Sequence, residues 1–333
     1  MIPDSNQQKR KGGAKMSIDP QKTAPVPTGP IIHKKTLGRR IAENWQYYIL
    51  ILPAIVYVAI WCYAPMYGLQ IAFKNYKFAL GITGSKWVGF RHFQDFFKGY
   101  YFKTLLRNTF AISLYSLGVG FPIPIIVALI LNELTPKFKK VVQTVMYAPH
   151  FISTVVLVGT MTLLFSPSTG IFNHLLAAMG FERIYFMGDP QYFRHMFVWS
   201  GVWQGMGWSA IIYLAALSNV DPTHLEAASI DGASRIQKII HINIPTIMPT
   251  IIIMLILRMG QIASVGYEKV YLMQNNLNMD VAEVISTYVY KRGIVNSNYS
   301  FSTAVGLFNN VVNVTLVMLA NFISKRVTRQ GLF

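Results

Sequence analysis

The sequence is poor in charged residues and almost free of cysteine. Only 13% of its 333 residues are Asp, Glu, Lys or Arg, which is about half the share of a soluble domain and too few to coat a soluble fold of this length. The one cysteine, Cys62, excludes an intrachain disulfide and any metal site built from paired cysteines. No Gly-x-x-x-x-Gly-Lys-Ser/Thr loop occurs, so ATP hydrolysis by this chain is not expected.

Acidic residues are scarcer than basic ones, with 13 Asp and Glu against 30 Lys and Arg. In a soluble protein that balance would favour nucleic-acid binding. Here the basic residues flank apolar runs, as they do around membrane spans, and no nucleic-acid partner is expected. The seven histidines show no metal-ligand spacing, so neither a metal nor a cofactor is predicted.

Apolar runs of membrane-spanning length recur along the chain. About 20 apolar residues cross a bilayer as a helix, and hydrophobic residues make up 53% of the sequence. Prolines inside such runs are tolerated because neighbouring helices satisfy the freed carbonyls. The sequence therefore predicts an all-α membrane protein with six transmembrane helices, at about 45–73, 104–132, 141–165, 196–217, 247–267 and 302–324.

The ends of the chain differ from its middle. Residues 1–44 are polar and rich in Lys, Pro, Gly and Gln, which predicts a basic disordered tail without a cleavable signal peptide. Taken together, the N-terminal tail, the connections after the second and fourth expected spans and residues 325–333 are denser in Lys and Arg than the other connections. Both termini are therefore predicted to be cytoplasmic. The expected division is the tail, a first helix with its outer loop (45–101), a transmembrane domain (102–324) and a cytoplasmic C-terminal tail.

The connection between the fourth and fifth expected spans, 219–245, carries strong local signals. Asp221 precedes a proline and is a good helix N-cap, and Gly232 should end that helix. Ser234 and Gln237 form a capping-box pattern that starts a second helix. Two capped helices on the cytoplasmic side fit a rigid lever pressed into a partner's groove, but the same residues also fit a capped surface loop without a partner.

The same connection resembles the EAA loop of binding-protein-dependent ABC importer permeases. The pattern is Glu-Ala-Ala-x-x-Asp-Gly-Ala, followed by Ile-x-Ile-Pro, with Ile244 where leucine is usual. In that family the loop forms a coupling helix that docks into a cleft of the cytoplasmic ATPase. The residues that match, and that the resemblance marks as ATPase-coupling residues, are Glu226, Ala227, Ala228, Asp231, Gly232, Ala233 and Pro245.

The resemblance extends over residues 40–333 and points to the polysaccharide branch of sugar importer permeases, which includes the alginate-oligosaccharide type and is related to the maltose type. It is carried by the segments 65–73, 87–90, 107–109, 131–133, 148–153 and 207–216.

That branch implies a type I (MetI-like) permease core in the bacterial cytoplasmic membrane and an oligosaccharide substrate. It also implies a heterodimer with a second permease, an ATPase dimer that holds ATP and Mg, and an extracytoplasmic solute-binding protein. Permeases for glycerol phosphate or peptides remain alternatives. An intramembrane enzyme is a weaker one, because no paired acids or Ser/His pair lie at membrane depth, and a channel or scaffold subunit would not explain the capped loop.

Polar and aromatic side chains inside the expected spans are candidates for the substrate path, because sugars bind amides, cations and ring faces. Asn and Gln also hydrogen-bond between membrane helices, and for single residues both roles stay open. Arg258 stands out, since an unpaired cation in a membrane is costly, and it motivates the hypothesis of an acidic, uronate-type substrate. The candidates are Trp203, Gln204, Trp208, Tyr213, Arg258, Gln261, Asn309, Asn310 and Asn313.

Overall fold

The computed structural model describes residue 38 and residues 43–328, without the side chains of 327 and 328. The N-terminal tail expected at 1–44 and most of the C-terminal tail expected at 325–333 therefore lie outside the described residues. The chain divides into two compact units, Met1–Tyr63 and Ala64–Phe333, and each is described by itself.

The first unit contains the helix α2 (Trp45–Val58), which runs into a π-helical turn, η1 (Ala59–Tyr63). Pro53 lies inside α2, where a membrane helix tolerates it. The helical geometry changes from α to π after Val58, beyond this proline.

The second unit opens with a 3-10 helix, η2 (Ala64–Phe73), and a small hairpin. Strands β1 (Lys74–Lys77) and β2 (Ser85–Trp87) pair antiparallel, with Lys74 opposite Trp87. A 3-10 turn, η3 (Phe78–Leu80), and α3 (Gly81–Gly84) connect them, and α4 (Arg91–Lys98) follows. The Tyr76 backbone N–H donates to Ser300 Oγ at 2.9 Å, so the hairpin is held against the start of the last helix.

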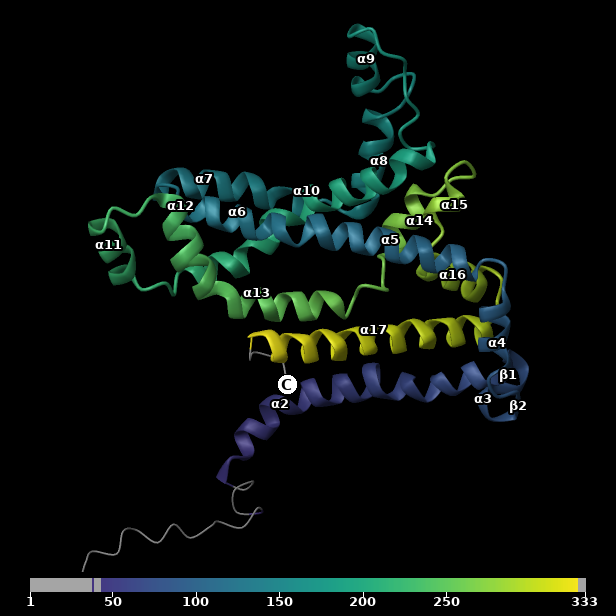
Figure 1. The fold of residues 1–333 in the computed structure, drawn as a ribbon. Helices are drawn as coiled ribbons and strands as arrows, with labels where there is room; N and C mark the ends of the chain where they lie inside the picture. Colours follow the sequence, from purple (N-terminus) through teal and green to yellow (C-terminus); the bar gives the residue numbers. More distant parts are fainter. Residues whose placement is uncertain (1–37, 39–42, 329–333) are drawn as a thin grey trace, which may run out of the picture. The chain divides into compact units, whose positions relative to one another are not determined.

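A helical bundle makes up the rest of the second unit (Figure 1). Its central helix is α10, which packs against α5, α6, α7 and α13. Short helices cluster at both ends of the bundle. The elements are α5 (Phe102–Gly120), α6 (Pro122–Asn132), α7 (Pro136–Tyr147), η4 (Ala148–Phe151), α8 (Thr154–Leu164), α9 (Ile171–Ala178), α10 (Pro190–Leu217), α11 (Pro222–Ile230), α12 (Arg235–Lys238), η5 (Ile239–Asn243), α13 (Ile244–Met259), α14 (Tyr267–Met273), α15 (Met279–Ala282), α16 (Ile285–Tyr290), η6 (Lys291–Val295) and α17 (Tyr299–Thr328).

Four described helices are long and apolar enough to cross a membrane: Trp45–Phe73, Phe102–Asn132, Arg235–Met259 and Tyr299–Arg326. A fifth is reached when the bent pair Pro136–Phe151 and Thr154–Leu164 counts as one span. The mostly helical membrane architecture is thus confirmed, whereas the count of six spans is not.

The third expected span, 141–165, is not one straight helix. The two helices of that region meet at 96°. The 3-10 turn η4 carries Pro149, and Ser153 then starts α8 by accepting a hydrogen bond from the Val156 N–H at 3.3 Å. A proline followed by a fresh N-cap restarts the helix in a new direction, and hydropathy alone did not reveal this.

The fourth expected span, 196–217, lies within α10, whose 28 residues are long enough for a membrane. It is not apolar enough to count among the candidate spans. Its central position explains the difference. A helix with protein on several sides keeps Gln, Ser, Trp and Gly that a lipid-facing helix would not.

The fifth expected span, 247–267, is shifted. The helix already begins at Arg235 and ends at Met259. The second helix expected in the 219–245 connection is therefore the first turn of this span. A π-helical turn, η5, lies directly before Pro245. Because a π turn changes the backbone pairing locally, the helix passes the proline without a break.

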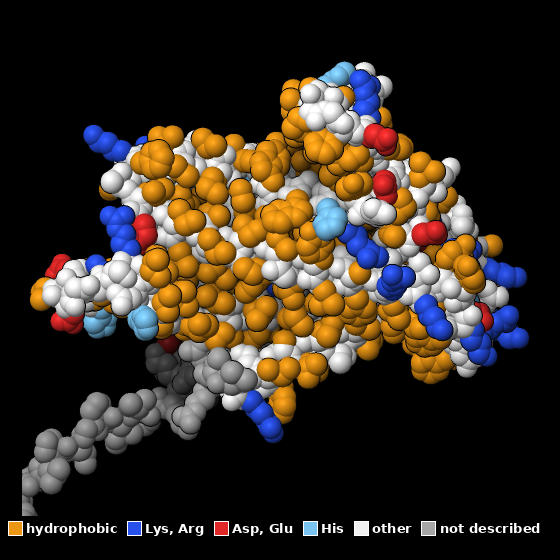
Figure 2. Space-filling model, turned by 45° about the horizontal axis from the view of Figure 1, so that its top comes forward, with side chains coloured by type: hydrophobic (Ala, Val, Ile, Leu, Met, Phe, Trp, Pro, Cys, Tyr) orange, Lys and Arg blue, Asp and Glu red, His pale blue; other side chains and the backbone are white. Residues whose placement is uncertain are grey.

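Hydrophobic side chains cover most of the middle of the face in Figure 2, and Lys and Arg gather toward its two ends. That distribution is the one expected of a bundle with its apolar band in a bilayer.

Candidate functional site

The helix α11 stands at one end of the bundle (Figure 1). Asp221 caps it, with Oδ1 accepting from the Thr223 N–H at 2.9 Å. Hydrogen bonds from the Thr223 backbone and side chain hold the pKa of the Asp221 carboxyl below its usual value. The capped helix therefore has a fixed start, as the sequence predicted.

The helix ends in a Schellman turn at Gly232. The Gly232 N–H donates to Ser229 O at 3.2 Å, and the Ala233 N–H donates to Ala228 O at 2.9 Å. Gly232 has φ +73°, a left-handed conformation that glycine adopts without steric cost. The predicted helix stop is confirmed, and it turns the chain back toward the bundle.

A capping box begins the next helix. The Gln237 N–H donates to Ser234 Oγ at 3.3 Å, and the Ser234 N–H donates to Gln237 Oε1 at 2.7 Å. Lys238 Nζ then donates to Ser229 Oγ at 2.7 Å, across the turn from α12 to α11. The two helices therefore form a braced unit, which we call the bracket (219–245).

The residues expected to couple to an ATPase lie on this bracket. Five of the seven are exposed, and the alanines 228 and 233 are half-buried. Ile230 beside them is 87% exposed, and Figure 2 shows the tip, with its acids, projecting from the bundle. The four exposed on the tip are Glu226, Ala227, Asp231 and Gly232, while Pro245 is exposed farther back, in α13.

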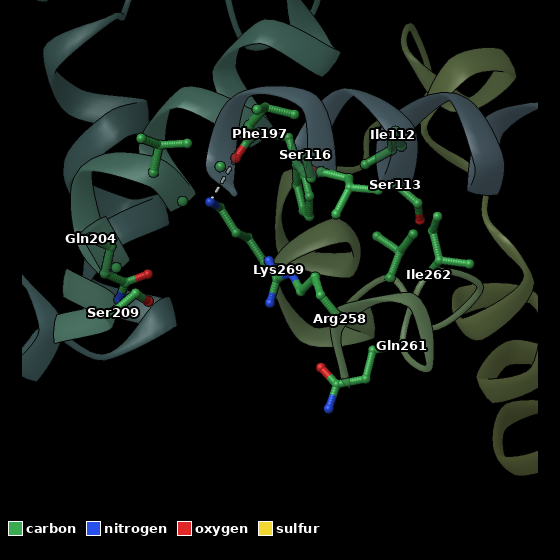
Figure 3. A pocket seen from close by; sticks show the side chains of 18 of the residues that line it. Ile112, Ser113, Ser116, Phe197, Gln204, Ser209, Arg258, Gln261, Ile262 and Lys269 are labelled. Carbon is green, nitrogen blue, oxygen red and sulfur yellow. Dashed lines mark hydrogen bonds between the residues drawn. The ribbon is translucent and has the colours of Figure 1, made fainter. Parts of the chain in front are cut away.

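A second feature is a cavity of about 470 Å³ inside the bundle (Figure 3). Residues of α5, α10, the end of α13 and the start of α14 line it. Its walls combine apolar side chains with hydroxyls, amides and two cations. The polar lining residues are Ser113, Ser116, Gln204, Ser209, Arg258, Gln261, Ser264 and Lys269.

Lys269 in α14 is the charged lining residue that the sequence did not reveal. Its Nζ donates to Phe197 O at 2.8 Å and lies 4.8 Å from the centre of the Phe197 ring. Burial lowers its pKa to about 8. A signal was present: Lys269 lies four residues from each of two apolar residues that are buried, Val265 before α14 and Met273 at its end.

Three of the nine substrate-path candidates meet at this cavity: Gln204, Arg258 and Gln261. Gln204 also serves packing, because its Nε2 donates to Ile152 O at 2.7 Å. Arg258 is exposed and lines the same cavity as Lys269 (Figure 3).

The asparagines of α17 have a structural place instead. Asn313 accepts from the Ala263 N–H at 2.9 Å and donates from Nδ2 to Ser264 Oγ at 2.8 Å. Asn309 points to the same hydroxyl at 3.5 Å, while Asn310 is exposed. Asn313 and Asn309 thus fix the segment that follows α13, and none of the three lines the cavity.

The aromatic candidates also lie apart from the cavity. Trp203 lines a separate, almost wholly apolar cavity of about 510 Å³. Trp208 stacks on His150, with ring centres 4.5 Å apart. Tyr213 is buried in a core cluster with Ala128 and Ile247. No group of three His, Cys, Asp or Glu side chains suited to a metal ion occurs within the described part of the chain.

Comparison with known proteins identifies the family. Residues 120–329, which include the bracket and most of the cavity, match the family described as binding-protein-dependent transport system inner membrane component. The chain belongs to this family. It is a permease subunit of an ABC transporter, a non-catalytic, multi-pass component of the inner membrane, as the resemblance of residues 219–245 to the EAA loop implied.

Individual proteins of known name are also similar to this permease in sequence. The permease is 45% identical to the protein LplB of Bacillus subtilis over 87% of its length and 92% of that protein. It is 41% identical to the B. subtilis polygalacturonan/rhamnogalacturonan transport system permease protein YteP over 90% of its length and 94% of that protein.

A solved structure is also similar. It is a chain of a bacterial alginate ABC transporter in complex with an alginate pentasaccharide-bound periplasmic protein. That chain is 40% identical, with a TM-score of 0.82, over 90% of this permease and 100% of that chain. The predicted family and the dependence on a binding protein are therefore confirmed.

Proposed function

We propose that this permease forms part of the translocation path of an importer for acidic oligosaccharides of the uronate type. The observation that carries the proposal is the cavity, where Arg258 and Lys269 present two cations beside amides and hydroxyls. Carboxylate groups pair with such cations, and sugar hydroxyls bond to such polar walls. Two similar proteins are named for the transport of polygalacturonan and of alginate, and both polymers are acidic polysaccharides.

The bracket is the proposed contact with the ATPase that drives transport. Its exposed tip, with Glu226, Asp231 and Gly232, would dock into a cleft of a cytoplasmic ATPase. An ATPase dimer would supply ATP and Mg, so no cofactor is assigned to this chain. A second permease would complete the translocation path as a heterodimer, and an extracytoplasmic solute-binding protein would deliver the oligosaccharide.

The orientation follows from the same assignment. With both termini in the cytoplasm, the bracket lies on the ATPase side, and the hairpin β1–β2 and α14–α16 lie outside. The density of Lys and Arg in the inner connections supports this direction.

The test is transport by the complete complex. The permease would be copurified with its partners, reconstituted in proteoliposomes with ATP inside, and given its binding protein loaded with trigalacturonate or with a neutral galactose trimer. ATP-dependent uptake of the acidic trimer is expected. Uptake restricted to neutral sugars, glycerol phosphate or peptides would overturn the proposed substrate class.

A crosslink tests the docking contact. A cysteine introduced at Ile230 should crosslink to the ATPase, while one at the exposed Phe181 should not. The opposite pattern would place the bracket on the wrong side of the membrane.

A further inference from the structure

The ammonium of Lys269 is held at the cavity wall by the neighbouring helix α10. It donates to Phe197 O at 2.8 Å and lies over the Phe197 ring at 4.8 Å, and Figure 3 draws this bond at the edge of the cavity. A lysine side chain is otherwise flexible, so a carbonyl and a ring face at one site fix the position of its charge.

Gly201 makes room for that charge. It follows Phe197 by one helical turn and also lines the cavity. A Cβ atom at position 201 would lie 3.2 Å from Lys269 Nζ, closer than an ordinary van der Waals contact. A side chain at position 201 would therefore crowd the ammonium and push it away by a few tenths of an ångström, so the glycine leaves the recess in which the charge now lies.

The charge has no carboxylate beside it in the described chain. Among residues 43–326, no carboxylate oxygen lies within 4.0 Å of Lys269 or Arg258, although such pairs occur elsewhere, as between Lys291 and Glu283 at 2.8 Å. An ammonium has three donors, and the Phe197 carbonyl takes one. The remaining donors can serve a ligand in the cavity.

We propose that Lys269, seated in the recess formed by Gly201 and Phe197, selects substrates by pairing with a sugar carboxylate during translocation. This inference rests on the proposed function and names the residue that carries its charge specificity. Lys269 is preferred to Arg258 because two contacts from α10 fix its ammonium. Gly201 is a positioning residue, because it acts only by leaving space for the Lys269 ammonium.

The experiment compares import of a trigalacturonate with import of its methyl ester, which has the same shape without the charges. In the complete reconstituted transporter, Lys269→Met is expected to lower the ratio of acid to ester import about tenfold or more, the usual size of a lost hydrogen bond to a charged group. Lys269→Arg should keep most of the ratio. Lys86→Met, at an exposed lysine in β2, should leave it unchanged.

A second pair of variants keeps the lysine. Gly201→Ala should lower the same ratio, because the new methyl group displaces the ammonium. Gly118→Ala adds the same group at a helical position in α5 where nothing lies within 4 Å, and it should not change the ratio. This pair still decides the question if Lys269→Met fails to assemble.

An unchanged ratio in Lys269→Met or in Gly201→Ala, at equal amounts of assembled complex, would overturn this inference and leave the proposed function standing. If the unaltered transporter imports no acidic oligosaccharide, the proposed function fails and this inference fails with it.

Discussion

Gly207 in α10 lies directly against the backbone of Met146 in α7. A Cβ atom at position 207 would come within 2.2 Å of Met146 O, so the two helices can approach this closely only with glycine there. Small residues at helix crossings have this role in membrane proteins generally. The contact lies near the 96° bend, where hydropathy had predicted a single straight span.

Gly207→Ala should therefore destabilise the permease. The added methyl group would force α10 and α7 apart at a cost of about 1–3 kcal/mol. A lower thermal unfolding temperature of the detergent-purified complex is the expected measurement. Gly159→Ala in α8, which has nothing within 4 Å, should not lower it, and equal effects of the two variants would contradict the packing argument.

Gly232→Val should weaken docking of the ATPase while the membrane bundle still assembles. The left-handed φ of +73° costs a side-chain-bearing residue about 1–2 kcal/mol, and relief of that strain would undo the Schellman turn. Copurification of the ATPase with the permease measures the effect. Gly180→Val is the matched control, because Gly180 has φ +84° in the segment after α9, far from the bracket in sequence.

Glu226→Lys should lower the affinity for the ATPase. The residue is exposed on α11, so reversing its charge leaves the fold intact and changes only the surface offered to the partner. We expect a loss of about tenfold, or roughly 1.4 kcal/mol, in binding and in substrate-stimulated ATP hydrolysis. Glu182→Lys reverses an exposed acid in the segment after α9; an equal loss there would indicate a general charge effect instead of docking.

Import of acidic oligosaccharides should weaken at alkaline external pH. Burial lowers the pKa of Lys269 to about 8, so the ammonium is about nine-tenths charged at pH 7 and about one-tenth charged at pH 9. Sugar carboxylates stay ionised across this range. Arg258 is the other cation lining the cavity.

The measurement is the acid-to-ester import ratio between pH 7 and 9. The ratio should fall as the pH rises through about 8 in the unaltered permease. It should stay flat in Lys269→Arg, whose charge does not titrate in this window. A fall of the same size in both proteins would assign the pH dependence to another component.

The sequence predicted the features that depend on neighbouring residues. Asp221, Gly232 and Ser234 each start or stop a helix where their side chains or backbone preferences require it, because such signals act within a few residues. Four of the six predicted spans overlap helices long and apolar enough to cross a membrane, since length and composition suffice to find them, although the one predicted at 247–267 is shifted.

Features that depend on how helices pack could not be predicted from one sequence. Arg258 and Gln261 reach the cavity, whereas Asn313, an equally polar residue, turns to Ser264. Which face of a helix meets the cavity depends on its rotation against its neighbours. Lys269 was missed for a related reason: a short helix outside the expected spans brings it to α10.

One helix runs without a break from Arg235, beside the turn of the bracket, to Met259, beside Arg258 in the cavity wall. Its 25 residues include the π-helical turn η5 and Pro249, and the Lys238–Ser229 bond fastens α11 to its base. Under the proposed function, a movement of the docked ATPase would therefore reach the cavity wall along one continuous helix and change the spacing between Arg258 and Lys269.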